Sequence, residues 1–198
     1  MSARPAPQID VRPVTAERWD DVLELFGERG AYAGCWCMWW RVTSSEFAAE
    51  AGRGLRNRFE ALVVEGREPG LVAYIDDRPV GWVAVAPRAE YGRMQRSPKL
   101  RRVDDVPVWV ISCFYIDRHH RRVGVATALL DAAVAFAHER GAAAVEGVPV
   151  DTSGTHKPTA GLYTGTLAMF AAAGFDEVER RGGRPIVRRW LRSKSQPS

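Results

Sequence analysis

A run of cationic and small residues, "RHHRRVGVAT" (118–127), lies where a predicted helix begins. Arginines stand directly before Val123 and Gly124, and no Ser, Thr, Asp or Asn stands there to cap the helix. The amino end of a helix carries free N–H groups and the positive end of the helix dipole, and both attract an anion. Glycine lets an anion come close to the backbone. Together these features predict a phosphate-binding loop.

A second chemical feature is the segment "GCWCMWW" (34–40), which combines two cysteines with three tryptophans. Tryptophan rings so close together can form an apolar wall or bind a cation through their faces. The alternative is a cover that packs over the core of a sheet. A zinc site needs about four ligands. A C-x-C pair with only Cys113 elsewhere falls short of that, so we expect no metal.

The predicted elements around these segments decide where they lie. Residues 106–117 are nearly all apolar, which predicts a buried strand. From Ala126 to Ala137 the apolar residues recur at helical spacing, so a helix follows. The anion loop therefore connects a buried strand to a helix. Patterning predicts these further elements: a strand at 8–14, a helix at 15–30 capped by Thr15, a helix at 44–66, a hairpin at 70–88, a polar loop or helical turn at 89–106, a strand at 142–150, a short helix at 165–174, and closing strands at 175–181 and 184–192.

This order of elements predicts a single α/β domain in which helices cover both faces of a mixed sheet. We place the domain at 8–192, between loose tails at 1–7 and 193–198. The chain has 28 Lys and Arg against 24 Asp and Glu, and a charge of +4 is too small to indicate nucleic-acid binding. No apolar stretch is long enough to cross a membrane, and the N-terminus lacks the apolar part of a signal peptide. Three cysteines without disulfide spacing favour the reducing cytoplasm.

The residues "RRVGVA" (121–126) fit the motif Q/R-x-x-G-x-G/A, with which the GNAT N-acetyltransferases hold the pyrophosphate of acetyl-CoA. The chain also resembles that superfamily in its element order and in "AMFAAAGFDEV" (168–178), which matches the usual short helix and following strand. The segments "GCWCMWWR", "PVGWVAVAPR" and "YTGTLAMFAAAGF" together resemble a bacterial GNAT subgroup. The resemblance implies a mostly antiparallel sheet with splayed central strands. It also implies direct transfer of acetyl from acetyl-CoA, the co-substrate, to an amine.

The resemblance further implies which residues bind the two substrates. Amides of the strand that ends in "CFYI" would face the thioester and the pantetheine arm, and a bulge in that strand would open a gap where the substrates meet. Amides of the anion loop would hold the pyrophosphate. The cofactor-binding residues implied are Phe114, Tyr115, Ile116, Arg121, Arg122, Val123, Gly124, Val125, Ala126 and Thr127. The aromatic segment lies on the acceptor side, which implies an acceptor pocket of Trp36, Cys37, Trp39, Trp40 and Cys113.

The residues for proton transfer depart from the family pattern. Many GNAT enzymes protonate the leaving thiolate with a Tyr four residues before a Gly-Phe pair, and Phe170 occupies that position here. Tyr163 could supply the proton instead, or it could only pack there. Glu146, in a predicted buried strand, is the first candidate base for the amine; the alternative is an ion pair with an arginine. Asp151, at the end of that strand, is the second candidate base.

Three functions remain open at this point. The first is an enzyme that acetylates a small-molecule amine as a monomer or homodimer, with Glu146 and the tryptophan faces favouring a cationic acceptor. The second is a protein or peptide N-acetyltransferase, which would need an open groove instead of a tryptophan-walled pocket. The third is a non-catalytic acetyl-CoA-binding module, which Phe170 favours and which would bind the nucleotide without turnover.

Overall fold

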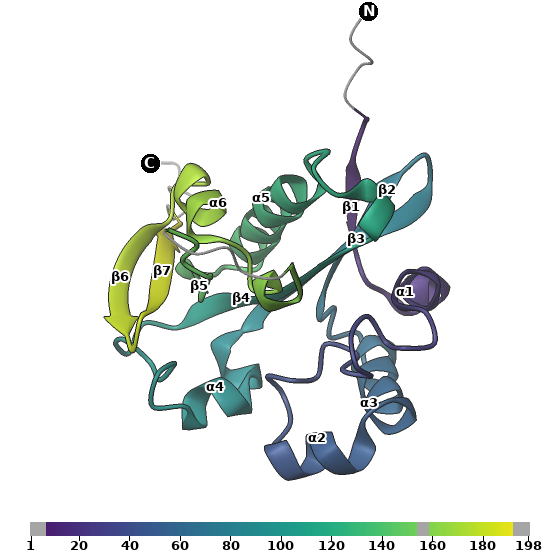
Figure 1. Ribbon diagram of the computed structural model, residues 1–198, viewed down its shortest axis with the longest axis horizontal. Coiled ribbons are helices and arrows are strands. Elements are labelled where there is room, and N and C mark those ends of the chain that lie inside the picture. The colour runs from purple at the N-terminus through teal and green to yellow at the C-terminus, as the bar shows by residue number, and fades with distance from the viewer. Residues whose placement is uncertain (1–6, 154–158, 192–198) are drawn as a thin grey trace, which may run out of the picture.

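One seven-stranded sheet forms the centre of the protein, in a computed structural model that describes residues 7–153 and 159–191 (Figure 1). The strand order is β1-β2-β3-β4-β5-β7-β6, and only β4 and β5 are parallel. The predicted α/β fold with a mostly antiparallel mixed sheet is thus confirmed. The predicted tails lie outside the described residues, apart from Pro7. The strands are β1 (Asp10–Pro13), β2 (Gly70–Ile75), β3 (Arg78–Pro87), β4 (Val108–Ile116), β5 (Ala144–Gly147), β6 (Asp176–Arg181) and β7 (Arg184–Trp190).

Helices cover both faces of the sheet, as predicted. The helices are α1 (Trp19–Phe26), α2 (Ser44–Glu50), α3 (Arg53–Val64), α4 (Gly92–Arg96), α5 (Val125–Glu139) and α6 (Leu167–Ala172). In Figure 1, α5 and α6 lie on one face and α1 to α4 on the other. Alternate residues of β3 point to opposite faces: Val83 joins the core under α5, and Trp82 joins the core under α1 and α3. Within the described part of the chain, no helix is long and apolar enough to cross a membrane.

The two central strands part half-way along their length. β4 pairs with β5 from Val108 to Ile111, although β4 runs on to Ile116. Opposite β3, the register shifts so that Ser112 is an extra residue in β4, which is a bulge. A bulge bends its strand and increases the local twist. The second half of β4 therefore leaves β5, and the splayed strands implied by the resemblance are present.

Three local predictions are wrong. The single helix predicted at 44–66 is two helices, α2 and α3, because the chain leaves the helical conformation at Ala51 and Gly52. The strand predicted at 142–150 ends early, at Gly147, because β4 bends away and offers later residues no ladder partner. Val150 makes only an isolated bridge beyond it. Thr15 does not cap α1, because a 3-10 turn comes between them and the Thr15 hydroxyl instead accepts a hydrogen bond from Arg18 at 3.2 Å.

A packed ring restricts position 147 to glycine. A Cβ added at Gly147 would lie 2.3 Å from the ring of Phe170, which is fully buried. We expect Gly147→Ala to lower the free energy of unfolding by about 1–3 kcal/mol, because the ring must shift within a packed core. Urea denaturation measures this change. Gly161→Ala is the control, since an added Cβ there meets no atom within 4 Å; equal losses in the two variants would contradict the explanation.

Candidate active site

The anion loop leads into an uncapped helix, as predicted. Gly124 is the N-cap of α5, and no side chain caps the free amides of the first turn. Gly124 has a φ of 94° and Arg122 a φ of 64°, which is an unusual region for a residue other than glycine. Asp117 fixes the approach to the loop, because its carboxylate accepts a hydrogen bond from the His119 amide at 2.9 Å. The exposed residues of the loop are Arg118, His119, Arg121, Arg122, Val123, Gly124 and Thr127.

The splayed half of β4 turns two amides toward the gap beside β5. Tyr115 pairs with Trp82 of β3, and the alternation of an antiparallel ladder directs the Phe114 and Ile116 amides to the opposite side. The Phe114 amide donates a hydrogen bond to the Tyr163 carbonyl at 2.6 Å. This corrects the expectation that the Phe114 amide faces the pantetheine arm, because in this structure the Tyr163 carbonyl occupies that amide.

The thiols of Cys37 and Cys113 lie together on the face of the sheet that α1 and α3 cover. Trp82 donates a hydrogen bond from Nε1 to the sulfur of Cys37 at 2.8 Å. A hydrogen bond with the Cys113 thiol and burial together raise the pKa of Cys37 well above its ordinary value. Cys37 therefore stays a neutral thiol at neutral pH. Among the residues that the structure describes, no three His, Cys, Asp or Glu side chains are grouped so that they could hold a metal ion.

Buried polar groups lie beside these thiols. The Arg41 guanidinium stacks on the ring of Tyr91, 4.9 Å from its centre, and pairs with Glu90. Nη2 of Arg41 and the hydroxyls of Tyr91 and Ser112 are buried, and they make no hydrogen bond of ordinary geometry with any described residue. Burial raises the pKa of Tyr91 to about 12. Since Ser112 is the bulge residue, these groups lie where β4 leaves β5.

Tyr163 lies at the rim of the same site. Burial raises the pKa of its hydroxyl, the charge of Arg184 lowers it, and the nearby Cys113 thiol raises it. The net rise keeps its hydroxyl protonated at neutral pH. Tyr163 lies between β4 and β7, because its carbonyl accepts a hydrogen bond from Phe114 and the adjacent Thr164 accepts one from Arg184. Arg184 donates a hydrogen bond to the Thr164 hydroxyl at 3.3 Å. Arg93 of α4 also lies close enough to Tyr163 to interact with it electrostatically.

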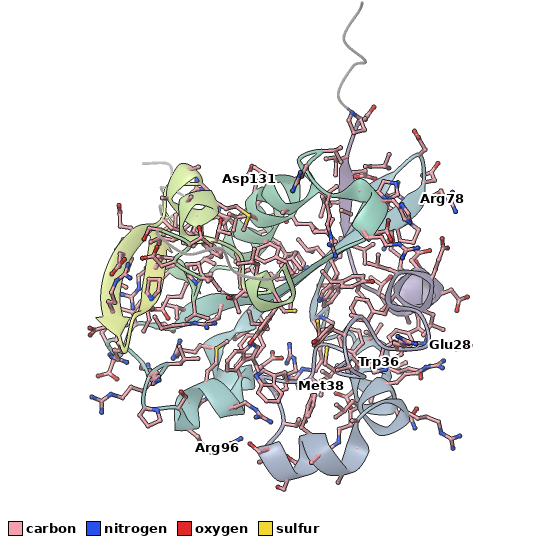
Figure 2. The ribbon with its side chains drawn as sticks, in the orientation of Figure 1. Glu28, Trp36, Met38, Arg78, Arg96 and Asp131 are labelled. Carbon is pink, nitrogen blue, oxygen red and sulfur yellow. The ribbon has the colours of Figure 1, made fainter. Side chains whose placement is uncertain are left out.

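The tryptophans of the aromatic segment are packed by the chain itself. Trp36, between α1 and α3 in Figure 2, is 3% exposed, and the guanidinium of Arg56 lies 5.7 Å from its ring centre. Trp39 is half-exposed, and Arg93 covers its ring at 3.8 Å. These faces, which we expected to attract a cationic acceptor, are thus taken by the chain's own arginines. Trp36 and Trp40 pack as the cover over the sheet that was the alternative.

Glu146 forms the ion pair that the sequence left as the alternative. Its carboxylate lies 2.6 Å from Nη2 of Arg188 and 3.0 Å from Nη1 of Arg88. Arg188 also pairs with Asp104 at 2.6 Å. Because arginines engage both oxygens of a fully buried carboxylate, Glu146 is a structural counter-ion and is not open to an acceptor. This corrects its assignment as the first candidate base.

Asp151, the second candidate base, is also engaged. Its carboxylate accepts hydrogen bonds from the hydroxyl and amide of Ser153, at 2.6 and 3.0 Å, and pairs with Arg180 at 2.8 Å. The Ser153 hydrogen bonds, followed by that of Arg180, hold the pKa of this carboxyl well below its ordinary value. A carboxylate of such low pKa is a poor proton acceptor.

The sequence did not single out several residues of this site. They come from separate elements, and the only indication was the density of cations at 89–106. The site residues found only in the structure are Arg41, Tyr91, Arg93, Ser112 and Arg184.

Comparison with known families identifies the chain. Residues 34–164 match the sequence model of the family described as "Acetyltransferase (GNAT) family". The chain belongs to the GNAT acetyltransferase family. The matched residues extend from the aromatic segment through the anion loop to Tyr163. Enzymes of this family use acetyl-CoA as their co-substrate, so this GNAT protein is an acetyl-CoA-dependent acyltransferase.

Solved structures share the GNAT fold at low sequence identity, which shows the fold alone. The PaiA N-acetyltransferase of Thermoplasma acidophilum, solved with coenzyme A, is 11% identical, with a TM-score of 0.52 over 93% of this chain and 99% of that chain. The polyamine N-acetyltransferase of Drosophila melanogaster is 12% identical, with a TM-score of 0.56 over 93% and 100%. A GNAT-family acetyltransferase of Listeria monocytogenes is 9% identical, with a TM-score of 0.55 over 92% and 95%. No curated protein matches the chain.

The buried ion pairs predict the outcome of removing the charge of Glu146. Glu146→Gln leaves Arg88 buried without a counter-ion, and breaking such a buried pair costs about 3–5 kcal/mol of the free energy of unfolding. Urea denaturation measures the loss. Glu177→Gln removes the exposed ion pair with Arg180 and should cost about 1 kcal/mol or less. If Glu146→Gln is as stable as the wild type, the counter-ion role is wrong and a base role returns.

Proposed function

We propose that this GNAT enzyme transfers acetyl from acetyl-CoA to the primary amine of a small molecule, by direct attack within a ternary complex. One observation carries the proposal. Beyond the Ser112 bulge, β4 has no partner in β5, and this unpaired length runs from the buried polar groups toward the uncapped start of α5. A donor held by its phosphates at α5 would thus have its thioester near the bulge. A thiol-release assay with acetyl-CoA against a panel of amines tests the activity.

The donor would be held mainly by backbone groups. Amides of residues 122–127 would bind the pyrophosphate, with Arg121 and Arg122 beside the phosphates. The Ile116 amide would bind the pantetheine arm, because it points away from β3 and no residue of β5 pairs with it. The Phe114 amide would first have to exchange the Tyr163 carbonyl for the donor. Donor binding and the position of Tyr163 are therefore coupled in this proposal.

Tyr163 would protonate the leaving thiolate. Its hydroxyl lies near Cys113 of the thioester strand, and its raised pKa keeps the proton available through the neutral range. Phe170 cannot share this task, because its ring is fully buried against Phe114 and Phe175. A phenol at Tyr163 supplies the proton that the family pattern takes from the position of Phe170.

The amine's proton would go to ordered water, because the two candidate carboxylates are engaged in ion pairs. Direct attack agrees with the surroundings of Cys113. A cysteine nucleophile needs an adjacent base, and the neighbour of Cys113 is the neutral thiol of Cys37. No acetylated cysteine intermediate is therefore part of the proposal.

A small acceptor is favoured by what surrounds the site. The aromatic segment (34–40), α4 and Tyr163 approach β4 from different sides. A peptide acceptor would instead need an open groove across the surface. The three cysteines are free thiols, which agrees with the cytoplasmic location that we predict. A monomeric or homodimeric state stays a prediction.

Replacement of Gly124 tests the donor site. A valine there is strained by the φ of 94° and puts a branched side chain over the helix amides. We expect Gly124→Val to weaken coenzyme A binding by about tenfold or more, which calorimetry measures. Gly141→Val is the matched control, because it strains a left-handed glycine with a φ of 78° at the opposite end of α5. Unchanged coenzyme A affinity in Gly124→Val would refute the donor site.

Removal of the Tyr163 hydroxyl tests the proton donor. We expect Tyr163→Phe to lower the single-turnover rate of acetyl transfer by about 10²-fold, the usual scale for loss of an acid catalyst, with coenzyme A affinity retained. Tyr32→Phe is the control, since Tyr32 is exposed on the loop that follows α1. A wild-type rate in Tyr163→Phe would remove Tyr163 from the chemistry and leave the donor site intact.

A further inference from the structure

Two arginines at the rim of the site have guanidinium groups without an anionic partner. Arg93 donates hydrogen bonds to the Val42 carbonyl at 3.2 Å and the Ser44 hydroxyl at 3.1 Å, while its Nη2 is buried and unpaired. Arg184 donates to the Thr164 hydroxyl, while its Nε is buried and unpaired. Within residues 7–153 and 159–191, neither arginine forms an ion pair.

Three arginines with almost fully buried side chains are compensated. Arg41, Arg88 and Arg188 have side chains that are at most 8% exposed, and each pairs with a carboxylate. Desolvation of an arginine is costly unless an anion compensates it. Burial and the neighbouring Arg96 lower the pKa of Arg93, which shows the same cost at the rim.

No described carboxylate is available to the rim arginines. Glu90 is the acid nearest to Arg93 in sequence, and it pairs with both Arg41 and Arg67. The charged groups with the largest influence on the Tyr163 hydroxyl, which interacts electrostatically with both rim arginines, are Arg184 and the thiols of Cys113 and Cys35. The rim is therefore a positive surface next to the buried groups at the bulge.

Both arginines are held in fixed orientations. The ring of Trp39 supports the guanidinium of Arg93 from one side, and the Thr164 hydroxyl holds that of Arg184. Oriented guanidinium groups bind carboxylate or phosphate oxygens through charge-assisted, often bidentate hydrogen bonds. Such a pair binds an anion, and it repels an acceptor that carries only positive charge.

We propose that the acceptor carries an anionic group in addition to its amine, and that Arg93 and Arg184 bind this group at the rim. The proposal rests on the proposed function, whose acceptor it specifies. The anionic group, a carboxylate or a phosphate, would orient the molecule so that its amine points toward β4. This replaces our expectation of a purely cationic acceptor, since the tryptophan faces and Glu146 are already occupied.

Matched pairs of amines test the proposal. L-amino acids are compared with their carboxamides, and O-phosphoethanolamine is compared with ethanolamine. Calorimetry with the coenzyme A-bound protein measures affinity, and thiol release measures kcat/KM. We expect the anionic member of a pair to bind about tenfold tighter or more, with the amino acid pairs and the phosphate pair showing which anion is preferred.

The arginine variants assign that preference to the rim. Arg93→Gln and Arg184→Gln should each lower the ratio of anionic to neutral affinity toward one, a loss of about tenfold. Coenzyme A affinity should be retained in both variants. Arg78→Gln is the control, because Arg78 is exposed at the start of β3 and lies far from α4 (Figure 2). Arg93→Lys keeps the charge and provides a second variant if Arg93→Gln is unstable; it should retain part of the preference.

The outcomes separate this proposal from the proposed function. The proposal is overturned if the neutral and anionic members of each pair bind with equal affinity, or if no anionic amine binds. Either result overturns it even if amines are acetylated. An anionic preference that survives in both Arg93→Gln and Arg184→Gln overturns it as well. An anionic preference in binding without thiol release from any pair supports the proposal and refutes the proposed function.

Discussion

One extra residue in β4, Ser112, sets the direction in which the second half of that strand runs. Up to Ile111 the strand is tied to β5, and beyond the bulge it is tied only to β3. The released edge keeps its amides, and a buried edge amide needs a partner. In this structure the Tyr163 carbonyl supplies one for Phe114. The separation of the strands and the position of the Tyr163 segment beside β4 both follow from the bulge.

Arginine has two opposite roles in this chain. Near β5 and β7, Glu146 and Asp104 compensate Arg88 and Arg188, so the charges stabilise packing and are closed to ligands. At the rim of the site, Arg93 and Arg184 donate hydrogen bonds to neutral partners only. The same residue type therefore stabilises packing in one place and, in our proposal, binds a ligand in the other, and the presence of a carboxylate is the difference.

Aromatic packing explains why the site departs from the family pattern at Phe170. The ring fills the space above Gly147, and it packs edge-on against Phe114 and Phe175. A hydroxyl on this ring would need a hydrogen-bonding partner in an apolar core. Tyr163, to which we assign proton donation in our proposal, is instead partly open to solvent.

Local features of this protein could be predicted from the sequence because they depend on neighbouring residues. Helical spacing predicted α5, and the apolar run 106–117 predicted β4. The absence of a capping side chain before the helix predicted its open start at Gly124. The mostly antiparallel sheet with splayed central strands then followed from the resemblance to the GNAT superfamily, whereas the strand order is known only from the structure. Periodicity could not place Thr15, where a 3-10 turn replaced the cap, nor the end of β5, which depends on a bulge in another strand.

Ionic and packing partners were decided only by the tertiary structure. Glu146 meets Arg88 and Arg188, which are 58 and 42 residues away, because β5 lies between β4 and β7 in the sheet. The tryptophan faces were likewise filled by arginines from other elements. Sequence spacing identifies which residues can do chemistry. Which of them are neutralised, and which stay open to a ligand, is decided by how distant elements cross, since electrostatic compensation depends on distance in space.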